Sequence, residues 1–134
     1  MTLMNAYAQY NNSKVLTASP QELTKMLYDG AIKFCNIAQI GLEKGDDLKF
    51  TTNLVKVENI VDYLNSTLDM KYPVAKDFEN VYNYLQDRLV MANIKKDKEI
   101  LEEVLEHLRT MRDTWKQVME LSVRENNARK VMAS

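Results

Sequence analysis

The chain has 134 residues, of which 46% are hydrophobic and 28% charged, values typical of one soluble globular domain. Its net charge of −1 offers no basic excess for neutralising phosphates, which argues against nucleic acid as a partner. The single cysteine excludes an intrachain disulfide. We see neither an apolar run of about 18 residues nor a signal peptide, so we expect a cytoplasmic protein without stable membrane association.

The first segment, residues 1–16, places Leu3, Tyr7 and Tyr10 at the spacing of one helical face. Asn11 and the polar residues after it interrupt this pattern, and so short a helix is not stable alone in water. The segment is either a frayed terminus or an arm that lies on the rest of the protein. We predict an arm, because two tyrosines and their apolar neighbours need a surface to lie on.

A strong helix start follows this segment. Ser19 is the predicted N-cap, Pro20 takes the first helical position, and Glu22 stands where its carboxylate closes a capping box with Ser19. The pattern predicts a helix from Pro20 to about Glu43, with Gly45 as its C-terminal cap.

The apolar residues of this first helix occupy more of its circumference than one neighbouring helix would cover. Gly30 lies in its middle, where glycine costs about 1 kcal/mol relative to alanine. We therefore expect another segment to pack closely against Gly30.

Three further helices follow. A heptad repeat predicts one over residues 47–70, and Pro73 separates it from the next, predicted over residues 74–95. Asp97 is a good N-cap for the last helix, whose pattern blurs after Leu121. Residues 122–134 either continue that helix or form a short fifth piece.

The absence of any strand pattern and the short connectors predict an all-α fold of one domain. We expect an elongated antiparallel up-down four-helix bundle over residues 20–121, preceded by the arm at 1–16 and followed by a tail at 122–134, with a possible short C-terminal helix.

Residues with catalytic or metal-binding chemistry are sparse. His107 has Glu103 one turn before it, but one such pair on a polar helix face does not make the ligand set of a metal-binding bundle. Cys35 sits among apolar residues and is expected to be a buried, inert thiol. Without a phosphate-binding loop or a nucleophile motif, we predict no enzyme activity, no metal and no cofactor.

Several motifs resemble one protein family in the same order along the chain. Residues 17–23 read Thr-Ala-Ser-Pro-Gln-Glu-Leu and residues 26–31 read Met-Leu-Tyr-Asp-Gly-Ala, which resembles the signature of the flagellin export chaperone family, FliS. Residues 6–10 match its aromatic N-terminal arm. Residues 67–70, Thr-Leu-Asp-Met, resemble its second-helix end, and residues 112–116, Arg-Asp-Thr-Trp-Lys, its last-helix motif. Lys71-Tyr72-Pro73-Val74 departs from the family, which usually has a Gly-Gly turn there.

The resemblance implies an elongated antiparallel bundle that binds the disordered C-terminal segment of flagellin, prevents its premature polymerisation and hands it to the flagellar export gate. The surplus apolar surface of the first two helices also predicts a groove for an amphipathic partner. The predicted groove and arm residues are Tyr7, Tyr10, Leu23, Leu27, Tyr28, Gly30, Ile37, Ile40, Val55 and Ile60.

One alternative uses the same apolar surface for self-association, as a structural or adaptor bundle. For the free protein the sequence leaves a monomer and a weak homodimer open.

Overall fold

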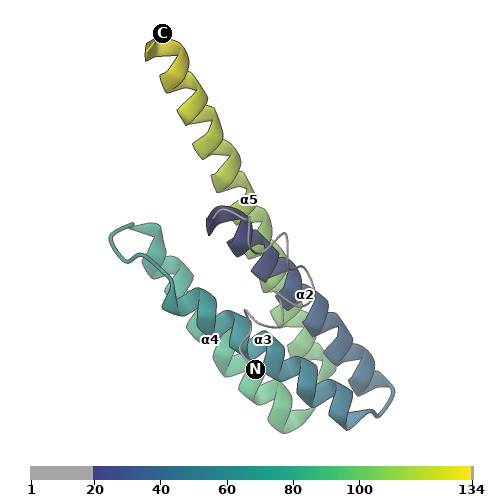
Figure 1. The fold of residues 1–134 in the computed structure, drawn as a ribbon. Coiled ribbons are helices and arrows are strands. Elements are labelled where there is room, and N and C mark those ends of the chain that lie inside the picture. The colour runs from purple at the N-terminus through teal and green to yellow at the C-terminus, as the bar shows by residue number, and fades with distance from the viewer. Residues whose placement is uncertain (1–19, 134) are drawn as a thin grey trace.

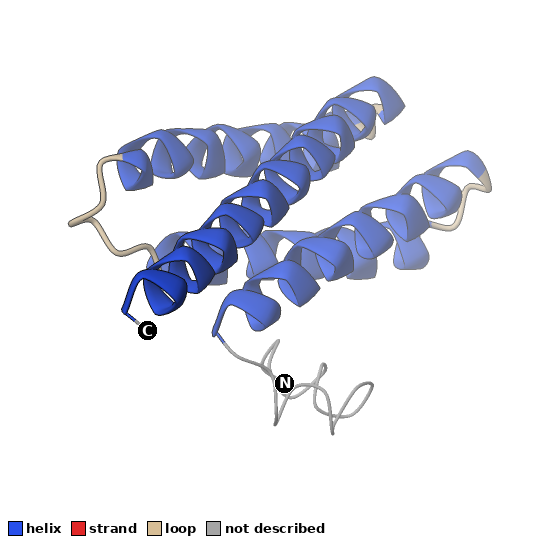
Figure 2. Ribbon diagram, turned by 90° about the horizontal axis from the view of Figure 1, so that it is seen from above, coloured by secondary structure: helices blue, strands red, loops and turns tan. Residues whose placement is uncertain are grey.

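The computed structural model describes residues 20–133, and within that range the chain forms helices and no strand (Figure 2). The helices are α2 (Pro20–Glu43), α3 (Asp47–Ser66), α4 (Val74–Lys95) and α5 (Lys98–Ala133). This confirms the predicted all-α bundle. The predicted arm at 1–16 lies outside the described residues.

The helices pack in a ring: α2 lies against α3 and α5, and α4 lies against α3 and α5 (Figure 1). Consecutive helices therefore pack side by side, while α2 and α4 face each other across the diagonal. Their inward stripes form one hydrophobic core. Its largest fully buried side chains are Tyr28, Phe50, Leu27, Leu54, Ile60, Leu85, Leu89, Leu101, Leu108, Val57, Val61 and Val104.

A tight turn joins α2 to α3. Gly45 has a φ of 70°, and the amides of Gly45 and Asp46 donate to the carbonyls of Leu42 and Gly41, which is the Schellman pattern of a helix C-terminus. Asp46 then caps α3 by accepting from the Lys49 amide at 3.0 Å. The predicted cap at Gly45 is confirmed.

Gly41 is the glycine at which the hairpin between α2 and α3 closes. A Cβ built there would lie 2.7 Å from the backbone nitrogen of Phe50 and 3.1 Å from the carbonyl oxygen of Asp46. Backbone atoms cannot move aside as a flexible side chain can, so the close approach of α3 to α2 requires glycine at this position.

Two other helix ends also follow local chemistry. Lys96 caps the C-terminus of α4. It lies in the left-handed region, at a φ of 51°, and its amide donates to the Ala92 carbonyl at 2.7 Å. Asp97 accepts from the Glu99 amide at 2.9 Å, which confirms it as the predicted cap of the last helix.

The second helix ends earlier than predicted, at Ser66 instead of Met70. The hydroxyls of Ser66 and Thr67 donate back to the carbonyls of Tyr63 and Leu64, at 2.8 and 3.2 Å. Such side-chain bonds to the backbone compete with helix propagation, so a run of asparagine, serine and threonine ends the helix although the apolar spacing continues.

The last helix runs unbroken through 36 residues to Ala133. At 1.5 Å per residue it is about 54 Å long, whereas α2 is about 36 Å. Its C-terminal end therefore projects beyond the other helices (Figure 1), and the side chains of residues 120–132 are exposed. Of the two alternatives for this stretch, the structure shows a continuation of the helix.

Candidate partner-binding site

The predicted groove residues divide into a buried and an accessible set. Leu27, Tyr28 and Ile60 have exposed fractions of 1%, 1% and 0%, and Gly30 is also buried. Leu27, Tyr28 and Ile60 belong to the hydrophobic core, so in this conformation their side chains are not available to a partner. Close packing against Gly30 stays a prediction.

The accessible candidates lie on α2 and α3. Ile40 and Val55 are exposed, at 41% and 45%, while Leu23 and Ile37 are half-buried. Their burial differs from that of Leu27 and Tyr28 although all sit in apolar patterns, because a helix with an apolar arc this wide turns part of it outward.

The remaining predicted residues stand at or before the start of α2. Pro20 is the first residue of α2, as predicted, and both Pro20 and Glu22 are exposed. Tyr7, Tyr10 and Ser19 lie outside the described residues, so the arm and the capping box remain predictions.

The buried Tyr28 hydroxyl meets the hydroxyl of Tyr82, which comes from α4 across the diagonal of the bundle. Phe78 stacks on Tyr82, with ring centroids 6.4 Å apart. Burial raises the pKa of Tyr28 far above the ordinary 10.0, and it raises the pKa of Tyr82 as well. Both phenols therefore stay neutral, and each supplies the hydrogen-bond partner that the other needs in the core.

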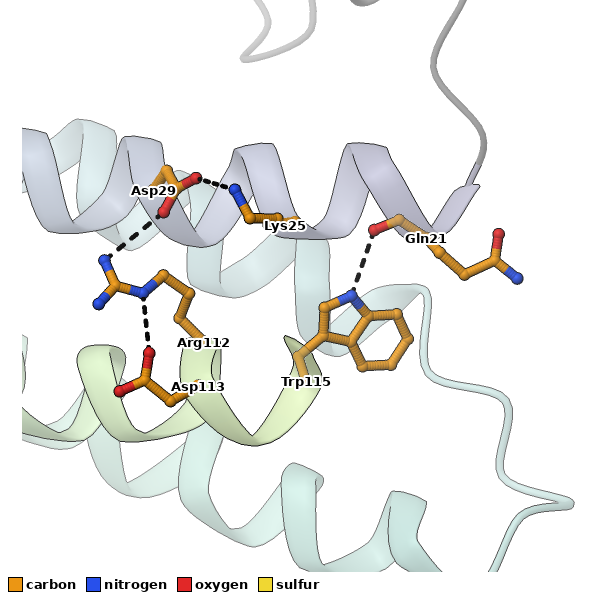
Figure 3. Close-up of polar contacts among 6 residues, drawn as sticks. All are labelled: Gln21, Lys25, Asp29, Arg112, Asp113 and Trp115. Atoms are coloured by element: carbon orange, nitrogen blue, oxygen red, sulfur yellow. Dashed lines mark hydrogen bonds and ion pairs between the residues drawn. The ribbon is translucent and has the colours of Figure 1, made fainter. Parts of the chain in front are cut away.

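Polar contacts close the furrow between α2 and α5 (Figure 3). The Trp115 indole nitrogen donates to the Gln21 carbonyl at 3.2 Å, and the Arg112 guanidinium lies 3.6 Å from the Asp29 carboxylate. Lys25 pairs with the other oxygen of Asp29 at 3.2 Å. Sequence reasoning did not predict a site role for Arg112 or Trp115, although both stand in the motif that resembles the family.

A second polar cluster closes the furrow between α4 and α5. The Tyr84 hydroxyl donates to Glu103 at 2.6 Å, and Arg88 donates to the same carboxylate oxygen at 3.1 Å. The bond from Tyr84 and the charge of Arg88 hold the pKa of Glu103 below its usual value. His107 packs edge-on against Tyr84, with ring centroids 5.7 Å apart.

The face between α2 and α3 differs from these two. Leaving aside Glu22, Met26 and Lys33, which have interactions of their own, the described residues of α2 and α3 share no hydrogen bond or ion pair beyond their connecting turn. Across it, the Lys56 ammonium of α3 lies 5.0 Å from the centroid of the Phe34 ring of α2. Phe34 and Tyr63 are only partly buried there. This face is therefore less polar than the α2–α5 and α4–α5 furrows and is a candidate for an apolar partner.

The cysteine and the possible metal ligands add no further site. Cys35 is buried, its thiol donates to the Leu101 carbonyl at 3.7 Å, and burial raises its pKa from 9.0 to about 12. Within residues 20–133, no three acidic, histidine or cysteine side chains gather as metal ligands, and no helix is long and apolar enough to cross a membrane.

The fold and its surfaces thus define a helical-bundle protein that leaves several apolar side chains of its helices exposed. Comparison with known proteins identifies the family. The sequence model of the flagellar protein FliS matches residues 3–122. The chain therefore belongs to the FliS family.

Relatives from several bacteria support this assignment. The flagellar secretion chaperone FliS of Bacillus subtilis is 39% identical over 120 residues, covering 90% of each chain. The protein of the same name from Salmonella typhimurium is 36% identical over 119 residues, which cover 86% of this chain and 88% of that one. The Vibrio cholerae chaperone is 27% identical over 118 residues, covering 86% and 87%.

Proposed function

We propose that this chain, a flagellar export chaperone by family, holds the C-terminal segment of flagellin on the face between α2 and α3. It does so in the cytoplasm, where the segment is masked until flagellin is passed to the flagellar export gate. The proposed contact residues are the accessible ones of α2: Leu23 and Ile37 on this face, and Ile40 on the outer surface of α2 beside it.

The observation that carries the proposal is the contrast between the furrows. Those between α2 and α5 and between α4 and α5 are closed by Trp115, Arg112, Tyr84 and Glu103. The α2–α3 face instead presents the partly buried apolar side chains of Phe34 and Tyr63, and Ile40 is exposed on the neighbouring outer surface of α2. An apolar face of this kind accepts the apolar stripe of an amphipathic helix.

A disordered segment that folds on this face gives up conformational entropy as it binds. The ordering cost lowers affinity for a given contact area, but it lets a short bundle cover a long stretch of chain. Such binding suits a chaperone, because the cargo must be released at export.

Light scattering tests the proposal against self-association. We expect the free protein to scatter as a monomer and to gain mass only when the C-terminal segment of a flagellin from the same genome is added. A stable dimer that is indifferent to the segment would support the structural or adaptor alternative and refute the proposal.

A matched pair of variants places the site. Ile40→Ser should weaken binding of the segment about tenfold, whereas Val123→Ser, which changes an even more exposed side chain on the projecting end of α5, should not. Equal affinities for the two variants would exclude the outer surface of α2 around Ile40 as part of the site.

The predicted arm would lie on part of this groove in the free protein and compete with the cargo. Deletion of residues 1–14 should then tighten flagellin binding and promote self-association of the free chaperone. Weaker binding with unchanged solubility would instead mean that Tyr7 and Tyr10 contact the cargo. If neither property changes, the arm proposal fails.

A further inference from the structure

The furrow between α3 and α4 differs from the α2–α3 face, because side-chain hydrogen bonds cross it and show which residues of α3 lie opposite which residues of α4. Gln86 of α4 donates to the Glu58 carbonyl at 3.1 Å and to the Asp62 carboxylate at 2.6 Å. Asn65 donates to Asn83 at 3.1 Å further along the same furrow. These contacts show which stripe of each helix lines it.

The same stripes carry four exposed aliphatic side chains. Val55 precedes Glu58 by one turn on α3, and Val90 follows Gln86 by one turn on α4, so the two valines flank the furrow from opposite sides. Leu48 and Ile94 continue the two stripes. The exposed fractions of Leu48, Val55, Val90 and Ile94 are 78%, 45%, 51% and 71%.

This apolar stretch, which we call the α3–α4 patch, is short and bounded by polar contacts. Gln86 and Asp62 bound it on one side, and the ion pair of Lys96 with Asp47, at 3.1 Å, bounds it on the other. The eleven residues from Leu48 to Glu58 span roughly 15 Å of helix. The patch thus has room for two to three turns of one helix.

Two carboxylates without a cation stand at one end of the patch. Among the described residues neither Glu58 nor Asp62 has an ion-pair partner, although they lie one turn apart on α3. Partial burial and the charge of Asp62 raise the pKa of Glu58. A cation brought by a partner would relieve this repulsion and would be bound in a partly desolvated position.

From this juxtaposition we propose that the α3–α4 patch docks a short amphipathic helix of a second partner protein, other than the cargo. That helix carries aliphatic residues at i, i+3 or i+4, and i+7, and a lysine or arginine that meets Glu58 and Asp62. The inference goes beyond the proposed function and assigns Val55, predicted from the sequence as part of the flagellin groove, to a separate surface.

The dimensions of the patch favour a short partner helix over a second copy of the chain and over the flagellin segment. A stable homodimer buries about 800 Å² on each partner, which four partly exposed aliphatic side chains do not provide. A long cargo segment needs a continuous path, whereas polar contacts close this furrow at both ends. One short helix satisfies both the length and the charge.

Two synthetic peptides of about 14 residues test the proposal. Both carry leucines at i, i+4 and i+7 on an alanine and glutamine background, and the turn after the leucines holds lysine in one and glutamate in the other. Binding to the ¹⁵N-labelled full chain is followed by amide chemical shifts. We expect the lysine peptide to bind at least tenfold more tightly and to shift amides of α3 and α4.

Variants complete the test. Val90→Ser and Ile94→Ser should each weaken the lysine peptide severalfold with unchanged melting, because both side chains are exposed, and Val123→Ser should have no effect. The paired change Glu58→Gln with Asp62→Asn should abolish the preference for lysine over glutamate. A saturating flagellin C-terminal segment should leave the affinity unchanged.

Three results would overturn the inference. Absent or unselective peptide binding would show that the patch is not a docking site for such a helix. Displacement of the peptide by the flagellin segment would assign the patch to the cargo, with the flagellin proposal intact. A homodimer that Val90→Ser dissociates would assign it to a second copy of the chain.

Discussion

Replacing Tyr28 by phenylalanine should destabilise the bundle although it removes a single oxygen atom. The lost hydroxyl leaves the Tyr82 hydroxyl without its partner, and the two side chains are only 1% and 2% exposed. A buried polar group left unsatisfied costs about 1–3 kcal/mol. For a chain of this size, such a loss should lower the melting temperature by roughly 3–10 °C.

The double variant makes the prediction specific. Tyr28→Phe with Tyr82→Phe removes both polar groups, so its stability should return to within about 1 kcal/mol of the starting protein. The free energies of unfolding would be measured by urea titration with circular dichroism, and the two single variants and the double variant give the coupling between the hydroxyls. Tyr84→Phe is the matched control, because the Tyr84 side chain is 44% exposed.

Additive losses in the double variant, or single variants as stable as the starting protein, would refute the role given to this pair. Flagellin binding distinguishes this structural role of Tyr28 from the role in the flagellin groove that the sequence predicted for it. Because Tyr28 is buried, Tyr28→Phe should leave the affinity of the folded protein for the flagellin segment unchanged. A large loss of affinity at unchanged stability would mean that Tyr28 contacts the cargo.

Three further predictions concern other positions. Gly41→Ala should lower the free energy of unfolding by about 1–3 kcal/mol in urea titrations, because its Cβ would meet the Phe50 backbone nitrogen at 2.7 Å; a more stable variant would contradict the close approach. Burial raises the pKa of the Cys35 thiol from 9.0 to about 12, so stability should hold below pH 9 and fall as the pH rises above it. Cys35→Ala should flatten the part of that fall between pH 9 and 10, below the range in which the buried Tyr28 and Tyr82 contribute, and an equally steep fall there in urea titrations would contradict it. Trp115→Phe removes the bond to the Gln21 carbonyl and should cost about 0.5–1.5 kcal/mol in the same assay, with no cost refuting the contact.

Much of the fold could be predicted because its determinants are local. The start of α2 at Pro20, the turn at Gly45 and the cap at Asp97 each depend on residues within one turn of the helix end. The end of α3 was missed for a reason that is also local. Apolar spacing continues through Leu68, but the hydroxyls of Ser66 and Thr67 bond to the preceding turn and end the helix.

The accessible surface was harder to predict, because it depends on which way a wide apolar arc is rotated. Tyr28 and Ile40 both belong to apolar patterns on α2, yet one is 1% and the other 41% exposed. The position of Tyr82 opposite Tyr28 follows from the packing of α4 across the diagonal, and no spacing within either helix reveals it. Likewise, the two flanks of the α3–α4 patch become apparent only once Gln86 fixes the register of α4 against α3.

Isothermal titration of the chain with two forms of one flagellin tests the central claim most directly. Intact flagellin should bind with one chaperone per flagellin, and the same flagellin without its C-terminal segment should show no binding, while the isolated segment restores it. Equal binding of the intact and truncated forms would contradict the account, because the chain would then hold flagellin through another part of its structure.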